Sequence, residues 1–231
     1  MLVILRRRYL RILLILPLFC LGGLFGGLLS SALTGATVVV DPGHGGIDGG
    51  CQDGRGNLEK DLNLAISRRV ADRLRQAGIS ASLTRRDDRE LGATYPRDLA
   101  ARRESARRAG ARALVSLHAN WCSDPAAEGA LAVIPPGSPQ SLQLAKAILN
   151  RLRVLGPVNQ EPLVMTDHGL LGTEPFPIVL VEVGFLSNPA EAARLQTPSH
   201  QDLLARAIAR GIADYLGAAG SRPPSPARRA R

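Results

Sequence analysis

The chain has 231 residues, of which 45% are hydrophobic but only 3% aromatic, and its formal net charge is +9 at pH 7. This length suits one domain of roughly 180 residues with appendages, built around an aliphatic core. The arginine-rich charge suits an anionic polymer or a membrane surface, whereas nucleic acid is excluded as a favoured partner because the sequence has no aromatic-interleaved basic patch and no nucleic-acid-binding motif.

The amino-terminal segment has the layout of an export signal. Four arginines within residues 6–11 precede an uncharged apolar stretch at residues 12–29. This stretch is longer than the usual signal core of about 7–15 residues and barely reaches the length of a spanning helix. The sequence therefore predicts residues 1–36 as a signal peptide or an N-terminal membrane anchor. In either case the rest of the chain is exported to the cell envelope or beyond, with membrane association through residues 12–29 if the segment is kept.

The first predicted element is a short buried strand at residues 38–40, where three valines are followed by Asp-Pro-Gly. Proline and glycine stop a strand, and His44 is the first long side chain beyond the stop. Open α/β sheets bind ligands at the carboxyl ends of their strands, and a neutral imidazole is a natural metal ligand. Taken alone, His44 fits a metal ligand and a hydrogen-bonded structural residue about equally well.

A helix is expected from residue 57 to about residue 77, with Asn57 as its N-cap. Apolar residues recur every four positions and form its buried stripe: Leu62, Ile66, Val70 and Leu74. Glu59 lies in the first turn, on the inward side. The helix dipole is an ordinary reason for an acid in a first turn, but an inward acid beside a histidine-bearing loop also suggests a functional site.

The next part of the chain leads to a second histidine. A strand is expected at residues 79–83, and the charged stretch 84–89 is interpreted as a loop, most of which is solvated. A surface helix is predicted at residues 96–109. Another short apolar strand, residues 113–117, is followed directly by His118. Two central strands that each deliver a histidine indicate a common site.

The following region is less informative. Residues 130–134 are expected to form an outer strand, and residues 141–155 an amphipathic helix. Residues 156–175 are punctuated by glycine and proline and are interpreted as irregular. They contain His168, a lone histidine of the kind that is more often a loop residue than a ligand.

The last predicted strand, residues 178–185, carries Glu182 inside an otherwise apolar run. A buried acid is costly unless it is paired or functional. A final helix is expected at residues 201–216, closed by Gly217. The Pro/Ser/Arg-rich residues 218–231 are predicted to be a disordered basic tail.

These observations converge on four side chains at one edge of the predicted sheet: His44, Glu59, His118 and Glu182. Two histidines and one carboxylate are a ligand set of catalytic zinc. Hydrolysis then needs a further carboxylate to move a proton. The alternative is that all four are structural polar residues with satisfied hydrogen bonds.

Export also bears on the cysteines. Cys20 lies in the targeting segment, which leaves Cys51 and Cys122 as a pair in an oxidising compartment. Because each cysteine follows one of the two histidines closely, we expect a disulfide that braces the site. The alternative is two unrelated free thiols.

The chain resembles the zinc-dependent N-acetylmuramoyl-L-alanine amidases, a family of bacterial cell-wall hydrolases. The resemblance rests on five stretches in family order that span nearly the whole exported part: residues 39–50, 59–64, 83–85, 115–120 and 180–189. It implies, for residues 37–217, a three-layer α/β/α sandwich with a mainly parallel sheet of about six strands. It also implies that His44, Glu59 and His118 hold Zn²⁺ and that Glu182 is the catalytic carboxylate. The implied reaction is hydrolysis of the amide between N-acetylmuramic acid and L-alanine of the peptidoglycan stem peptide.

Within the family, a short chain without a wall-binding repeat resembles the amidases of endospore formers, which act on cortex peptidoglycan. One departure is the stretch 165–176, where the family usually runs a shorter leucine-arginine segment into the last strand. Two rivals stay open: another exported zinc peptidase that cuts within the stem peptide, and a non-catalytic wall-binding module. The sequence does not identify an activating protein partner.

Overall fold

The computed structural model describes residues 37–220. The segment predicted as a signal or anchor, 1–36, and residues 221–231 of the predicted tail lie outside the described residues. Among the residues that are described, no helix combines the length and the hydropathy needed to cross a membrane.

A six-stranded sheet forms the middle of the molecule, in the order β2-β1-β3-β6-β4-β5. Its strands are β1 (Thr37–Pro42), β2 (Ala81–Leu83), β3 (Ala111–Asn120), β4 (Leu131–Ile134), β5 (Leu163–Val164) and β6 (Ile178–Phe185). Every neighbouring pair is parallel except β4 and β6, which are antiparallel. The prediction of a mainly parallel sheet of about six strands is confirmed.

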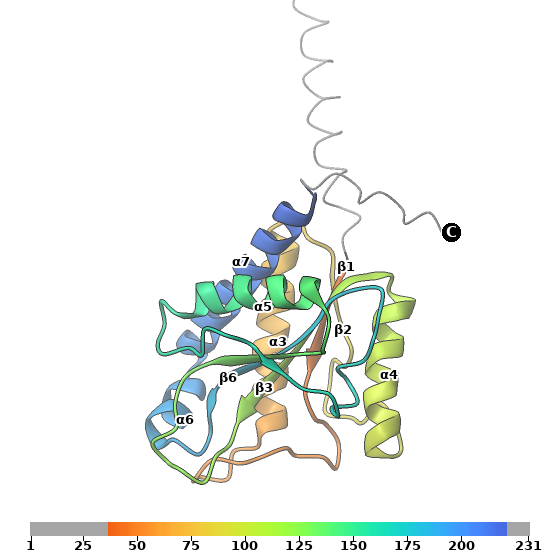
Figure 1. The fold of residues 1–231 in the computed structure, drawn as a ribbon. Helices are drawn as coiled ribbons and strands as arrows, with labels where there is room; N and C mark the ends of the chain where they lie inside the picture. The colour runs from red at the N-terminus through yellow and green to blue at the C-terminus, as the bar shows by residue number, and fades with distance from the viewer. Residues whose placement is uncertain (1–36, 221–231) are drawn as a thin grey trace, which may run out of the picture. The chain divides into compact units, whose positions relative to one another are not determined.

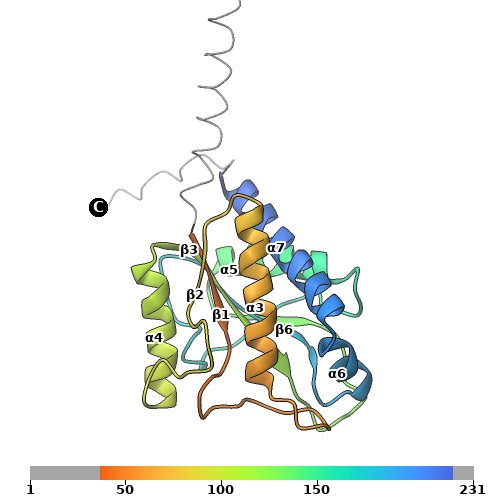
Figure 2. The same ribbon diagram turned by 180° about the vertical axis from the view of Figure 1, so that it is seen from behind.

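Helices cover both faces of this sheet (Figures 1 and 2). They are α3 (Glu59–Gln76), α4 (Tyr95–Arg108), α5 (Pro139–Leu152), α6 (Pro189–Leu195) and α7 (Pro198–Gly220). The α3, α5 and α7 helices pack with one face in a large aliphatic cluster. The α4 helix packs on the opposite face together with the segment around Leu170 and Phe176. This is the predicted α/β/α sandwich.

The alternation of side chains along the strands divides the core between the two faces. Val38 and Val40 lie in the larger cluster and Val39 in the smaller one, and all three are fully buried. The same alternation places His118 and Glu182 on one face, because they are register partners in the parallel pair β3·β6. The central strands β1, β3 and β6 therefore bring their carboxyl ends to one edge.

Several predicted boundaries are wrong. The predicted outer strand, now β4, lies one position inside the edge, because β5 forms in the stretch expected to be irregular. Asn57 does not cap α3; the N-cap is Leu58, which makes no side-chain capping bond, and the Asn57 amide instead donates to Asp53. Gly217 does not end the last helix, which continues to Gly220 and so into the first residues of the predicted tail.

Candidate metal centre

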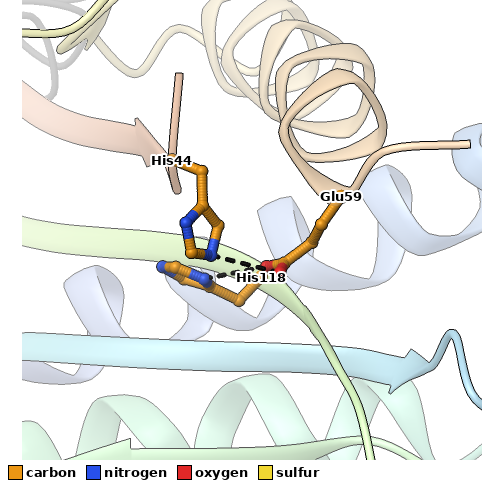
Figure 3. A group of neighbouring side chains, drawn as sticks. All are labelled: His44, Glu59 and His118. Carbon is orange, nitrogen blue, oxygen red and sulfur yellow. Dashed lines mark hydrogen bonds and ion pairs between the residues drawn. The ribbon is translucent and has the colours of Figure 1, made fainter. Parts of the chain in front are cut away.

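The two predicted histidines and Glu59 meet at the carboxyl edge of the sheet. His44 lies in the turn after β1, His118 lies in β3, and Glu59 is the first residue of α3. Each offers one ligand atom, and these atoms lie within 4.8 Å of one another. Figure 3 shows the three side chains turned toward one another. Two imidazoles and a carboxylate form a donor set that suits a transition-metal ion such as zinc, so the residues fit a metal centre.

Glu59 is the centre of this group. Its Oε2 lies 3.1 Å from Nε2 of His44, and its Oε1 lies 3.0 Å from Nδ1 of His118. Three further donors hold the carboxylate: the backbone N–H groups of Cys51 and Ala119 and the side-chain amide of Asn63. Glu59 is only 4% exposed. Its buried charge is therefore stabilised from several sides, and its position relative to both histidines is fixed.

A second carboxylate orients His44 from the other side of the ring. Nδ1 of His44 lies 2.8 Å from Oδ2 of Asp48, and the backbone N–H of Gly50 donates to the other oxygen of Asp48. With Nδ1 committed to Asp48, Nε2 is the nitrogen left to face Glu59. Such carboxylate–histidine pairs are typical of metal sites, where they fix the ring and its tautomer. Asp48 was not singled out in the sequence; its only signal is the spacing of four residues from His44 within one loop.

The charges within the group shift the pKa values in opposite directions. Burial acts to lower the pKa of His44, but Glu59 and Asp48 outweigh it and raise the pKa to about 9. Burial acts to raise the pKa of Glu59, but the hydrogen bonds and charges of both histidines lower it far below its usual range. At neutral pH without metal, His44 is therefore an imidazolium paired with a carboxylate. A metal ion that binds its Nε2 must displace a proton.

The turn that carries His44 has an unusual backbone. His44 has φ = +60° and is the one non-glycine residue with positive φ within residues 37–220. This left-handed conformation costs a residue with a side chain on the order of 1 kcal/mol. Gly43 precedes it because the His118 ring fills the adjacent space: a Cβ at position 43 would lie 2.2 Å from Cε1 of His118. The turn is thus shaped so that the two rings can approach.

Two buried arginines hold this turn in place. Arg85 donates to the carbonyl groups of Pro42 (3.1 Å), Gly43 (2.9 Å) and Lys60 (2.9 Å). Arg102 of α4 donates to the carbonyl groups of Pro42 (2.7 Å) and His44 (2.9 Å). Residues 86–89 of the charged loop are exposed, as expected for most of it, whereas Arg85 is 0% exposed. Its sequence signal was its place two residues after a strand, at the same edge as His44.

A buried carboxylate completes this framework beneath the turn. Asp41 is fully buried and accepts hydrogen bonds from Arg102 (2.9 Å), from Ser116 (2.7 Å) and from Thr84. Burial acts to raise the pKa of Asp41, but Arg102 and the two hydroxyl groups lower it below its usual value. Asp41 thus stays ionised and neutralises the buried guanidinium of Arg102.

Glu182 is held very differently. It is the register partner of His118 on β6, and its Oε2 is buried without a hydrogen-bond partner among the described residues. Burial raises its pKa to about 7, and the charge of Glu59 adds to the rise, whereas the charges of His118 and His44 oppose it. A carboxyl group with a pKa near neutrality can both accept and return a proton at physiological pH.

The remaining predictions at this edge have mixed outcomes. His168 is not in the group of ligand atoms, but it lines a small pocket together with His44 and His118. Its Nδ1 lies 3.3 Å from the backbone N–H of Leu170, and burial lowers its pKa. The predicted disulfide is absent, because Cys51 and Cys122 are both free.

The Cys51 thiol instead lies 3.3 Å from the carbonyl oxygen of Ala119, to which it donates. Its surroundings do not favour a reactive thiolate. Burial and the nearby charge of Glu59 raise the pKa of Cys51 far above its usual value.

Comparison with known proteins gives one consistent family. The family model for N-acetylmuramoyl-L-alanine amidase matches residues 38–214. The germination-specific N-acetylmuramoyl-L-alanine amidase of Bacillus subtilis is 34% identical over 204 residues, which cover 84% of this chain and 85% of that protein. The amidase AmiA of Escherichia coli is 30% identical and is covered to 75%, against 78% of this chain.

Solved structures agree with the sequence matches. The CwlD amidase from Clostridioides difficile, solved in complex with the GerS lipoprotein, superposes with a TM-score of 0.74 at 33% identity. The match covers 79% of this chain and 99% of that one. The amidase AmiC2 of Nostoc punctiforme gives a TM-score of 0.69, also at 33% identity, over 79% of this chain and 98% of that one.

Proposed function

Because the chain belongs to the N-acetylmuramoyl-L-alanine amidase family, we propose how its own residues divide the work of that reaction. The chain is a peptidoglycan hydrolase that cleaves the amide between N-acetylmuramic acid and L-alanine of the stem peptide. What remains to be assigned is the metal, its ligands and the group that moves protons.

The metal is Zn²⁺, held by His44, Glu59 and His118. The observation that carries this assignment is the convergence of their ligand atoms within 4.8 Å, in a donor set of two imidazoles and one carboxylate. When bound there, zinc polarises the scissile carbonyl and makes water a stronger acid. Asp48 orients His44 through Nδ1, and Arg85 and Arg102 hold the backbone of the turn.

Glu182 is the catalytic carboxylate. Its buried Oε2 has no partner among the described residues, and its pKa of about 7 leaves it partly ionised at neutral pH. It takes a proton from the attacking water and returns that proton to the nitrogen of L-alanine as the amide breaks. Its position beside His118 in the β3·β6 register puts it next to the metal centre.

Export, a cortex substrate and a protein partner are further parts of the proposal. A hydrolase of peptidoglycan must reach the wall, which agrees with the export signal expected in residues 1–36. The Bacillus subtilis relative is named a germination-specific amidase, and the Clostridioides difficile amidase was solved with a lipoprotein. These likenesses support spore-cortex peptidoglycan as the substrate and an envelope lipoprotein as an activating partner.

The test is product identification. Purified residues 37–231 with zinc are incubated with peptidoglycan, and the soluble products are identified by mass spectrometry. We expect free stem peptides that begin with L-alanine. Cleavage inside the stem peptide would instead support an exported zinc peptidase, and binding without any product would support a wall-binding module.

A further inference from the structure

Two cavities flank the metal centre on opposite sides. The first has a volume of about 620 Å³, and its walls include Arg55, Trp121, Ser187 and Gln196. The second has a volume of about 450 Å³, and its walls include Ile47, Asp48, Glu90 and Tyr95. Both are large enough for one or two residues or sugars of a substrate. The second also contacts the metal centre through His44, whereas the first contains none of the proposed metal ligands.

The sheet order places the cavities on different sides of the reacting bond. The first cavity is lined by the segments that follow β3 and β6 and by residues 52–55, the far part of the long segment between β1 and α3. The second is lined by residues 44–48, directly after β1, and by the segment that follows β2 with the start of α4. In the order β2-β1-β3-β6, the first cavity is therefore on the side of Glu182 and the second on the side of His44. Because Glu182 protonates the leaving nitrogen, the departing peptide must begin on the side of β6.

The chemistry of the first cavity suits an acidic peptide. Arg55 is exposed and supplies a guanidinium. The amide nitrogen of Gln196 is buried without a partner, which a carbonyl or carboxylate oxygen would satisfy. The acid in this cavity, Asp53, is already occupied by Asn57 and by the backbone N–H of Arg55. Trp121 is 56% exposed and offers an apolar face for a side chain.

The second cavity has the opposite character. Of its two exposed carboxylates, Asp48 is paired with His44, whereas Glu90 accepts a hydrogen bond from the backbone N–H of Ile47. A stem peptide with free carboxylates would be repelled by the charge of Glu90. Its arginine, Arg102, is buried and already paired with Asp41 and Asp98. Ile47 and Tyr95 are 94% and 59% exposed, which suits the largely uncharged sugar part of the substrate.

We propose that the cavity of Arg55, Trp121 and Gln196 is the subsite for the acidic stem peptide, and that the glycan lies toward the cavity of Ile47 and Tyr95. The substrate thus lies across the metal centre, with the glycan on the side of β1 and the stem peptide on the side of β6. This orientation rests on the proposed role of Glu182, whereas the charge of the two cavities supports it independently.

The test uses the full zinc-loaded chain and two substrates that differ in one group. One is N-acetylmuramoyl-L-alanyl-D-glutamyl-L-lysine with a free glutamate α-carboxylate, and the other is its amide. We expect the wild type to have a KM about tenfold lower for the carboxylate, as one charge-assisted hydrogen bond can give. Arg55→Gln should remove this difference. Arg112→Gln is the matched control, since Arg112 is exposed near the amino end of β3, and it should retain the difference.

Two more variants test the direction. Trp121→Ala should raise KM for both substrates, whereas Ile47→Ala should leave the carboxylate preference intact. The proposal is wrong if the wild type shows no preference, if Arg55→Gln retains it, or if Ile47→Ala removes it. Failure to release L-alanyl peptide from either substrate would contradict the proposed function itself, and the orientation would fall with it.

Discussion

The ends of β1 and β6 lie at the same edge of one sheet but are built on opposite principles. At the end of β1, the carbonyl groups of Pro42, Gly43 and His44 accept hydrogen bonds from buried arginines, and the nearby Asp41 is fully paired. At the end of β6, one oxygen of Glu182 is buried without a partner in the described part of the chain. Burial raises the pKa of Glu182, whereas the pKa of Asp41 is lowered because Arg102 and two hydroxyl groups outweigh the effect of burial.

The contrast between Asp41 and Glu182 shows that the pKa of a buried carboxylate depends on its hydrogen-bond and charge partners, and not on burial alone. Asp41 is the more deeply buried of the two, yet it is structural because its charge is compensated by Arg102 and two hydroxyl groups. The buried Oε2 of Glu182 has no such donor among residues 37–220, and the pKa of Glu182 is about 7. The end of β1 is therefore organised to stay in place, whereas the end of β6 has the properties that the proposed proton transfer by Glu182 requires.

The largest effect of a substitution is expected at Glu182, at the end of β6. Glu182→Gln keeps the shape of the side chain but cannot accept a proton, so we expect kcat to fall about 10³-fold, within the usual range for a general base. Zinc content, measured by elemental analysis, should not change. Glu161→Gln, an exposed carboxylate paired with Lys146, is the control. Retained activity of Glu182→Gln would remove its assigned role.

At the end of β1, where Asp41 is paired with Arg102, a substitution should instead change the free energy of unfolding. Arg102→Met leaves Asp41 as a buried charge without its cation, and we expect a loss of about 3–5 kcal/mol in the free energy of unfolding. Denaturant unfolding of the metal-free protein measures this. Arg107→Met removes an exposed arginine of the same helix, paired with Glu174, and should change stability little. Equal effects of the two variants would show that Asp41 does not need Arg102.

A smaller effect, on zinc affinity, is expected from the residue that orients His44. Asp48→Ala removes the acceptor of Nδ1 and should weaken zinc binding by about 10- to 100-fold, the range measured for such outer partners of metal ligands. A competition titration with a chromogenic chelator measures this affinity. Asp87→Ala, an exposed acid paired with Arg89, is the control. Unchanged affinity in Asp48→Ala would mean that the turn alone orients the ring.

The pH dependence of zinc binding should follow His44. Its pKa of about 9 in the metal-free protein means that one proton must leave before the nitrogen can bind zinc. Apparent zinc affinity should therefore rise about tenfold per pH unit from neutrality and level off near pH 9. Calorimetry in buffers of different ionisation enthalpy should detect release of about one proton per zinc at pH 7. No proton release would contradict the imidazolium assignment.

The smallest effect is expected at the cysteines. Because Cys51 and Cys122 are free, a reducing agent should not change the melting temperature. Under denaturing, non-reducing conditions both thiols should react with an alkylating reagent, as mass mapping can detect. A peptide pair that stays linked through these two residues would restore the disulfide hypothesis.

Much of the candidate site could be predicted because local sequence patterns indicate the strands and the helix that position it. The valines at 38–40 and the largely apolar residues 178–183 predict buried strands. Because His44, His118 and Glu182 lie at or near the carboxyl ends of parallel strands, they were expected at one edge of the sheet. The first turn of α3 placed Glu59 on the inward side, as found. These inferences need only the periods of helix and strand.

The framework around the site was missed because long-range contacts decide it. Arg85 stands among other charged residues, and its place after a strand does not by itself indicate that it is buried while its neighbour Arg86 is exposed. The carbonyl groups of Pro42 and Gly43, which accept its hydrogen bonds, account for its burial. The edge strand β5 has two exposed residues, Leu163 and Val164, and so lacks the buried pattern of a strand. Asn57 had the right residue type for a cap, but Asp53 competes for it.

The spread of the proposed metal ligands along the chain links the site to folding. His44, Glu59 and His118 belong to three elements that meet only after β1, α3 and β3 have docked. An unfolded chain cannot present them together, so a bound ion acts as a ligand of the native state and shifts the folding equilibrium by mass action. The enzyme would then be least resistant to unfolding and proteolysis before it acquires metal, and loading would mark completed assembly of this half of the sheet.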